Sequence, residues 1–144
     1  MRVSICIPTY NRASHLRNCL HSIISNQSRS AIDFEVCVSD NCSTDETEKV
    51  VRCAQESIDI KYHKNPENIG IPRNFLNVVE MASGEFVWLI GDDDLLMPYA
   101  LEELNALIGK HPDVDFFYVN SYCLASQYVQ SFPQPFDIAN LPKK

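Results

Sequence analysis

Three consecutive aspartates, Asp92, Asp93 and Asp94, are the residues of this chain best suited to chemistry, and they follow the apolar run 86–90. Adjacent carboxylates repel one another, so they need a cation, protons or full solvation. Hard divalent ions such as Mg²⁺ and Mn²⁺ prefer oxygen ligands and often complete their shell with substrate phosphates. We therefore predict an Mn²⁺ or Mg²⁺ site here. The alternative is a solvated acidic turn that caps the next helix, a role that Asp94 could fill alone.

A second polar segment follows the first apolar run of the chain and consists of Pro8, Thr9, Tyr10, Asn11 and Arg12. Thr9 and Asn11 offer hydrogen bonds, Tyr10 offers a face for stacking, and Arg12 is a candidate partner for a phosphate. Proline and asparagine are also ordinary turn residues, so a simple strand-to-helix turn is the alternative.

A third polar segment, residues 40–45, follows the second apolar run. Ser43, Thr44 and Asp45 are good helix-capping residues, and capping accounts for most of them. Asp40 remains, and its carboxylate could accept a hydrogen bond from a base N–H or a ribose hydroxyl.

The polar segment 65–74 leads into a helix, and Arg73 near the start of that helix either meets a phosphate or is a surface charge. The four histidines lack metal-ligand spacing. Glycine occurs only at positions 70, 84, 91 and 109, which weighs against a Gly-rich dinucleotide fingerprint and against a P-loop.

The elements that must position these residues alternate between strand and helix. Apolar periodicity predicts strands at 3–7, 34–39, 58–63, 85–90 and 115–120, and helices at 13–25, 43–55, 72–84 and 98–109. Pro8 should end the first strand, and Ser43 with Glu46 should form the capping box of the second helix. Such alternation implies an α/β, mostly parallel, doubly wound sheet with ligands outside the carboxyl ends of its strands. The three polar segments follow strands one, two and four of this scheme.

Length and composition limit the class of protein. A chain of 144 residues with 45% hydrophobic residues fits one domain, expected at 1–131, followed by an irregular Pro-rich tail at 132–144. The net charge of −7 argues against a nucleic-acid partner, although a divalent cation can join carboxylates to a diphosphate. The six cysteines contain no C-x-x-C pair, and no signal peptide or membrane-spanning run is evident. We therefore expect a cytoplasmic protein.

Four segments in order, residues 4–12, 38–45, 68–74 and 84–94, resemble the family 2 glycosyltransferases of the GT-A fold. The resemblance covers about residues 2–121. It departs from the usual pattern at Asn41, where the family often has a second acidic residue, and at Cys42, where it has glycine. Gly91 stands where another aspartate is common.

The resemblance implies a Rossmann-like sheet that binds a nucleoside diphosphate sugar. The loop 9–12 and Asp40 would surround its base and ribose, and Asp92 would lie near the ribose or the sugar. Asp93 or Asp94 would reach the metal that stabilises the leaving diphosphate. A literal D-x-D pattern selects Asp92 and Asp94, whereas counting back from Pro98 favours Asp93.

Family catalytic domains are longer than this chain, so the resemblance also implies an N-terminal, truncated portion of an enzyme. The acceptor would be a saccharide or a lipid-linked saccharide in bacterial surface polysaccharide synthesis of the O-antigen type, at the inner face of the membrane. No catalytic base is identified, and nothing marks Asp137 in the tail as one. A shortened sheet could expose apolar surface and favour a homo-oligomer.

Three alternatives remain. The chain could bind a nucleotide without turnover, because it lacks an identified base. A phospho-acceptor signalling domain would carry an acidic pair after its first strand, where this chain has Pro8, Thr9 and Tyr10. A sugar nucleotidyltransferase would carry a Gly-rich phosphate loop at that point.

Overall fold

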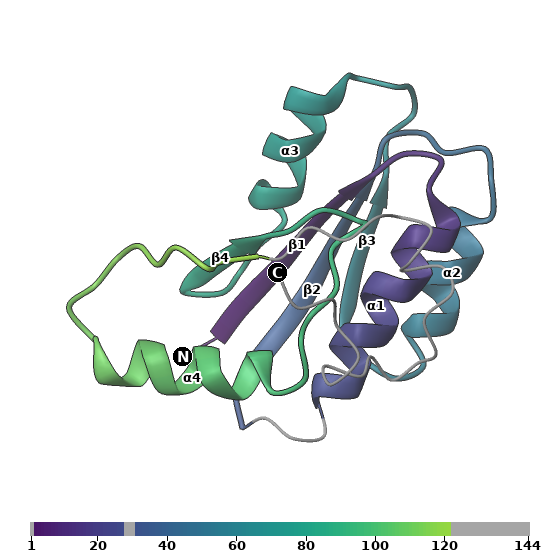
Figure 1. Cartoon of the computed structure of the whole chain (residues 1–144). Coiled ribbons are helices and arrows are strands. Elements are labelled where there is room, and N and C mark those ends of the chain that lie inside the picture. Colours follow the sequence, from purple (N-terminus) through teal and green to yellow (C-terminus); the bar gives the residue numbers. More distant parts are fainter. Residues whose placement is uncertain (1, 28–30, 122–144) are drawn as a thin grey trace.

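The structure, a computed structural model, describes residues 2–27 and 31–121, in which strands and helices alternate (Figure 1). The elements are β1 (Arg2–Thr9), α1 (Ala13–Gln27), β2 (Asp33–Asp40), α2 (Thr47–Ala54), β3 (Ile60–Lys64), α3 (Ile71–Glu80), β4 (Phe86–Leu89) and α4 (Ala100–Lys110). The sheet has the order β3-β2-β1-β4, and each neighbouring pair is parallel. The predicted α/β class and the first four predicted strands are confirmed.

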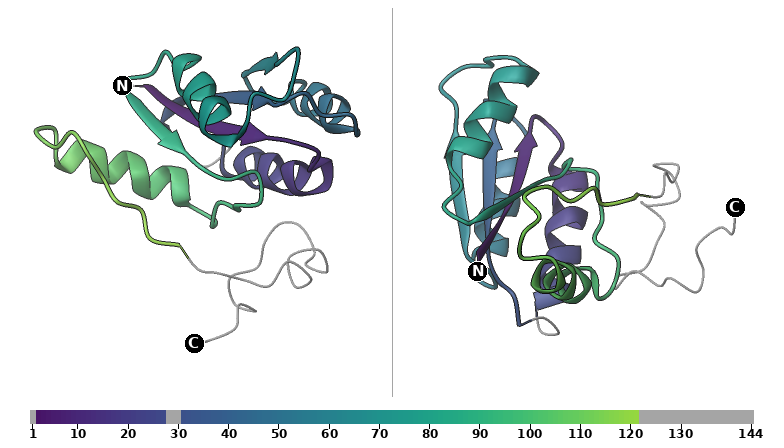
Figure 2. Two further views of the ribbon diagram at one scale, coloured as in Figure 1. Left: turned by 90° about the horizontal axis from the view of Figure 1, so that it is seen from above. Right: turned by 90° about the vertical axis from the view of Figure 1, so that its left-hand side faces the viewer.

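Helices cover both faces of the sheet. Helix α3 lies on one face, while α1 and α2 lie on the other, with α4 beside α1 (Figures 1 and 2). The central strands β1 and β2 are therefore buried almost from end to end, as expected for parallel strands covered on both sides. The main core lies between the sheet and α1, α2 and α4. A smaller cluster of Cys6, Cys37 and Val78 lies under α3.

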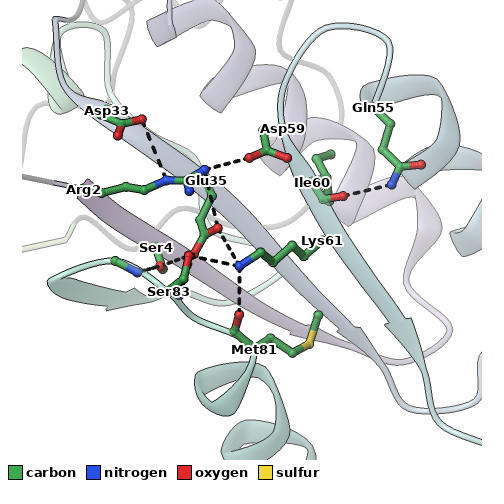
Figure 3. Close-up of polar contacts among 11 residues, drawn as sticks. Arg2, Ser4, Asp33, Glu35, Gln55, Asp59, Ile60, Lys61, Met81 and Ser83 are labelled. Carbon is green, nitrogen blue, oxygen red and sulfur yellow. Dashed lines mark hydrogen bonds and ion pairs between the residues drawn. The ribbon is translucent and has the colours of Figure 1, made fainter.

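A buried carboxylate joins the starting ends of all four strands (Figure 3). Glu35 Oε1, in β2, accepts hydrogen bonds from Ser4 Oγ of β1 (2.6 Å) and from the backbone N–H of Ser83 before β4 (2.7 Å). Lys61 Nζ of β3 lies 2.9 Å from Glu35 Oε2. Burial alone would raise the pKa of Glu35, but the hydrogen bonds from Ser4, Lys61 and Ser83 outweigh it and lower the pKa to about 2.

The predicted strand at 115–120 is wrong, because these residues form no strand in the structure. Phe116 and Tyr118 are 79% and 82% exposed, while Phe117 packs at a tilt against Phe86 of β4 with a ring distance of 6.0 Å. The alternation of apolar residues is real, but within the described ranges no neighbouring strand pairs with this segment. The predicted tail at 132–144 lies outside the described residues.

All four helices differ from their predicted bounds, and α3 ends at Glu80, four residues before the predicted end. The capping box is wrong, because α2 begins at Thr47 and its N-terminal N–H bonds to Asp45 Oδ1 (3.0 Å) rather than to Ser43. Gly109 does not end α4, which runs on to Lys110, because a single glycine costs a helix only about 1 kcal/mol. No helix in the described part of the chain is long and apolar enough to cross a membrane.

Candidate functional site

The three polar segments predicted from the sequence meet at the carboxyl edge of the sheet. Thr9 and Asp40 end β1 and β2 and are register partners. Thr9 Oγ1 donates a 2.8 Å hydrogen bond to Asp92 Oδ2, which follows β4. Because β1 lies between β2 and β4, its end joins the other two segments.

Asp92 and Asp93 share one cation, the guanidinium of Arg12. Asp92 is buried, and Arg12 Nη1 lies 3.1 Å from its Oδ1. Arg12 Nη2 lies 2.9 Å from Oδ2 of Asp93, whose side chain is half exposed. Burial raises the pKa of Asp92, while the Thr9 hydrogen bond and the Arg12 charge act in the opposite direction. Arg12 thus offsets the repulsion between two adjacent carboxylates.

Asp94 turns back onto its own loop. Its Oδ2 accepts a 2.7 Å hydrogen bond from the backbone N–H of Gly91, and the residue is otherwise exposed. A Cβ at position 91 would lie 2.7 Å from Asp93 Oδ1 and 3.3 Å from Asp94 Oδ2. A side chain at Gly91 would therefore displace the carboxylates of this turn.

The loop after β1 is held by the loop after β2. The backbone N–H of Asn11 donates to Ser43 Oγ, and Asn11 Oδ1 accepts from the backbone N–H of Thr44, each at 2.8 Å. Asn11 has a φ of 51°, in the left-handed region that asparagine tolerates. Tyr10 is 44% exposed, so its side chain is partly open to solvent. Pro8, predicted to end the first strand, is instead buried inside β1.

Asp40 is fully buried, and both of its carboxylate oxygens already accept hydrogen bonds. Oδ1 accepts from the backbone N–H of Ser43 at 2.8 Å, and Oδ2 accepts from the hydroxyl of Tyr62 at 2.7 Å. Burial and the bond to Asp40 raise the pKa of Tyr62. A base N–H could reach Asp40 only by sharing one of these oxygens. The base contact predicted for Asp40 stays a prediction.

Arg73 is exposed on the first turn of α3 and forms no ion pair with the described residues. The structure does not bring it to the aspartates, and its predicted phosphate contact stays a prediction.

Two contributors to this edge were not predicted from the sequence. One is Tyr62, which bonds Asp40 from the neighbouring strand β3. The other is a network of amides that we call the amide cluster. Its members are Asn41, Asn65, Asn68, Asn74 and Asn77. Four asparagines within residues 65–77 were a visible signal, but their partner at position 41 was not.

The carboxylates around Arg12 offer oxygen ligands for a divalent cation, but they are not arranged to surround one. Within residues 2–27 and 31–121, no three histidine, cysteine, aspartate or glutamate side chains are placed to hold a metal ion. Magnesium is usually bound through one or two carboxylates together with substrate phosphates. The half-exposed Asp93 and the exposed Asp94 fit that mode of binding.

A family model described as glycosyl transferase family 2 matches residues 4–138. The chain belongs to glycosyl transferase family 2. Among similar family members, the abequosyltransferase RfbV of Salmonella typhimurium is 40% identical over 116 residues, which are 79% of this chain and 34% of RfbV. A Campylobacter jejuni member is named GalNAc(5)-diNAcBac-PP-undecaprenol beta-1,3-glucosyltransferase and is 39% identical over 105 residues, 72% of this chain and 33% of that protein.

Solved structures of the family have the same fold. TarS 1-349 of Staphylococcus aureus matches with a TM-score of 0.70 and 29% identity, covering 78% of this chain and 33% of that one. TarS structures in complex with UDP and with UDP-GlcNAc also match. The mannosyltransferase PcManGT of Pyrobaculum calidifontis, in complex with GDP-Man and Mn²⁺, matches with a TM-score of 0.63 and 26% identity, covering 78% of this chain and 32% of PcManGT. The sheet is therefore that of a GT-A glycosyltransferase. The chain spans about a third of the length of RfbV and of PcManGT and 20% of the longer TarS chain.

Proposed function

We propose that this chain is the donor-binding part of a family 2 sugar transferase. It binds a nucleoside diphosphate sugar through a divalent cation, Mn²⁺ or Mg²⁺, in an enzyme that transfers the sugar to a saccharide or lipid-linked acceptor. The observation that carries the proposal is the junction of Thr9, Arg12 and Asp92 at the carboxyl edge of the sheet. That edge is where parallel α/β sheets bind ligands.

Each half of the donor has candidate partners among the described residues. Tyr10 offers its exposed ring to the base, and Asp40 with its loop borders the nucleoside. Asp92 is held by Thr9 and Arg12 near the ribose or the sugar. These contacts would orient the donor across the ends of β1, β2 and β4.

The diphosphate half lies beside the exposed carboxylates. Asp93 and Asp94 would hold the cation, and Arg12 and Arg73 are the candidate partners for the phosphate oxygens. The bound metal supplies a Lewis acid that stabilises charge on the departing diphosphate. Asp93 contacts Arg12 of the loop after β1. If Asp93 also binds the metal, donor binding is coupled to the position of that loop.

The acceptor is proposed from the relatives. RfbV is an abequosyltransferase, TarS acts on poly(ribitol-phosphate), and the Campylobacter enzyme carries an undecaprenol-linked saccharide in its name. This similarity supports a role in bacterial surface polysaccharide synthesis. A place on the cytoplasmic side of the membrane is part of the proposal. Self-association is compatible with the exposed apolar side chains after α4 but is not required.

The alternative is a chain that binds the donor without turnover. Asp40, Asp92, Asp93 and Asp94 already have parts in the proposed donor binding. Among the described residues we identify no other side chain as the base that must deprotonate an acceptor. Asp137 lies outside the described residues. Release of sugar or nucleoside diphosphate from the donor would favour the enzyme, whereas tight binding without release would favour the alternative.

Calorimetric titration of UDP, GDP and CDP, with Mn²⁺ and then with a chelator, tests the proposal. We expect one nucleotide to bind with a dependence on metal. Asp93→Ala or Asp94→Ala should weaken that binding at least ~10-fold, because each removes a charged oxygen ligand. Asp113→Ala removes the same charge from an exposed turn after α4 and serves as the control. A folded chain that binds none of the three nucleotides would refute the proposed function.

A further inference from the structure

The amide cluster lies next to the proposed donor site, where β2 and β3 end and α3 begins. Asn41, Asn65 and Asn74 are each at most 4% exposed. A buried amide is costly unless its oxygen and its nitrogen both have partners, so the cluster constrains the segments that carry it.

Backbone groups fix the direction of the hydrogen bonds in the cluster. Asn74 Nδ2 donates to the carbonyl oxygen of Ser39 (3.0 Å), which can only accept, so Asn74 Oδ1 must face the other way. That oxygen accepts from Ser39 Oγ (2.7 Å) and from Asn65 Nδ2 (2.9 Å). Asn77 Nδ2 in turn donates to Asn65 Oδ1 at 3.1 Å. The start of α3 is thereby attached to the end of β2.

The same reasoning fixes Asn41. The backbone N–H of Ile69 can only donate, and it donates to Asn41 Oδ1 at 2.9 Å. Asn41 Nδ2 therefore faces Asn68 Oδ1, 2.8 Å away. The Asn68 oxygen also accepts from the backbone N–H of Gly70 (2.9 Å), so Asn68 is the acceptor and Asn41 must be the donor.

These bonds hold a turn against the strand end that carries Asp40. The backbone N–H of Asn41 donates to Thr9 O (2.9 Å), and the backbone N–H of Asn65 donates to Asp40 O (2.8 Å). The turn 68–70 ends in Gly70, whose φ of 83° leads the chain into α3. An aspartate at position 41 could accept from Ile69 but could not donate to Asn68.

We infer that Asn41 is a positioning residue of the donor site. The N–H₂ group of its side chain holds the turn 68–70 beside Asp40, and this turn borders the nucleoside side of the site. The inference rests on the proposed function for the ligand, but the geometry of the turn can be tested separately.

Two matched variants test the direction of the bond. Asn41→Asp and Asn68→Asp each add one negative charge to the same pair of loops without changing side-chain shape. Asn41→Asp removes the donor and sets a carboxylate oxygen against Asn68 Oδ1. Asn68→Asp keeps an acceptor for both Asn41 and Gly70. We expect the affinity for the nucleotide with Mn²⁺ to fall at least ~10-fold further in Asn41→Asp than in Asn68→Asp.

Amide hydrogen exchange provides the readout that does not depend on a ligand. The Gly70 amide should exchange faster than in the wild type in Asn41→Asp and no faster in Asn68→Asp, while both variants keep the wild-type circular dichroism spectrum. Equal effects of the two variants on affinity and on exchange would overturn the inference. If the folded wild-type chain binds no nucleotide, both the proposed function and the donor-site role of Asn41 fail. The difference in Gly70 amide exchange between the two variants then still shows whether Asn41 holds the turn.

Discussion

Cys42 adopts a backbone conformation that favours glycine, with a φ of 69°. Cys42 lies two residues after Asp40, and its left-handed conformation turns the chain so that the backbone N–H of Ser43 donates to Asp40 Oδ1. The family usually has glycine here, and the structure gives the reason, because a side chain costs about 1–2 kcal/mol in this region. The Cys42 thiol donates to Pro66 O at 3.6 Å, which recovers little of that cost.

Cys42→Gly should therefore stabilise the chain. Relief of strain exceeds the entropy that glycine adds to the unfolded chain, and we expect the free energy of unfolding to rise by up to about 1 kcal/mol. Urea denaturation measures the change. Cys42→Ala, which removes the thiol and keeps the strain, is the control and should not be stabilised. A Cys42→Gly chain less stable than Cys42→Ala would contradict this explanation.

At the scale of elements, the carboxylate of Asp45 accepts hydrogen bonds from the first residues of two helices. Asp45 Oδ2 accepts from the backbone N–H of Ala13, the first residue of α1, at 3.0 Å. Its Oδ1 accepts from the backbone N–H of Thr47, the first residue of α2. Burial would raise the pKa of Asp45, but the bonds from Thr47 and Ala13 outweigh it and lower the pKa below its usual value. Negative charge at a helix start also opposes the positive end of the helix dipole.

Asp45→Ala should lower the free energy of unfolding by about 2 kcal/mol, because two helix starts lose their cap. Asp45→Ser can cap α2 but cannot reach Ala13 as well, so its loss should be about half as large. Thermal and urea unfolding would measure both. Equal losses for the two variants would mean that the contact to Ala13 contributes nothing to stability.

The elements that could be predicted from the sequence are those with a buried face. Apolar runs predicted the first four strands because both faces of the central strands are covered. The same pattern failed at 115–120, where Phe116 and Tyr118 point outward. Periodicity reports which residues could be buried, whereas pairing with a neighbouring strand depends on the rest of the fold.

The site could be predicted only where its residues follow strands. The rule for parallel sheets placed Thr9, Asp40 and Asp92 at one edge, and the structure brings Thr9 and Asp92 into contact. It could not reveal that Arg12 pairs with two aspartates 80 or more residues away, or that Asn41 meets Asn68. Those contacts depend on how the loops cross above the strands.

At the scale of the whole molecule, the buried carboxylate of Glu35 and the proposed donor site lie at opposite ends of the sheet. Glu35 joins the starting ends of the strands (Figure 3), whereas Asp92, Asp93 and Asp94 follow the carboxyl end of β4. The pKa of Glu35 is lowered from 4.5 to about 2, a difference that corresponds to roughly 3 kcal/mol. A carboxylate with a lowered pKa stabilises the fold above its unfolded pKa and loses that contribution as the pH falls.

Glu35→Gln should therefore cost roughly 3 kcal/mol of unfolding free energy at pH 7. The difference from the wild type should shrink as the pH falls from about 5 to about 2, because the wild-type carboxylate becomes protonated in that window. Urea denaturation at a series of pH values measures it. Glu56→Gln, at an exposed position after α2, is the control and should change stability by less than about 0.5 kcal/mol. A difference that stays constant with pH would exclude this role of the charge.

The position of β4 also has a consequence for how the molecule assembles. β1, β2 and β3 are consecutive along the first 64 residues, whereas β4 returns to pair Phe86 with Val3. A ribosome releases the chain from its N-terminus, so three strands and three helices can form before β4 emerges. Pairing of β4 with β1 completes the sheet, and the aspartates reach Arg12 only with that step. Donor binding would then be acquired at the end of folding, and a nascent chain would stay unable to capture nucleotide until its sheet is complete.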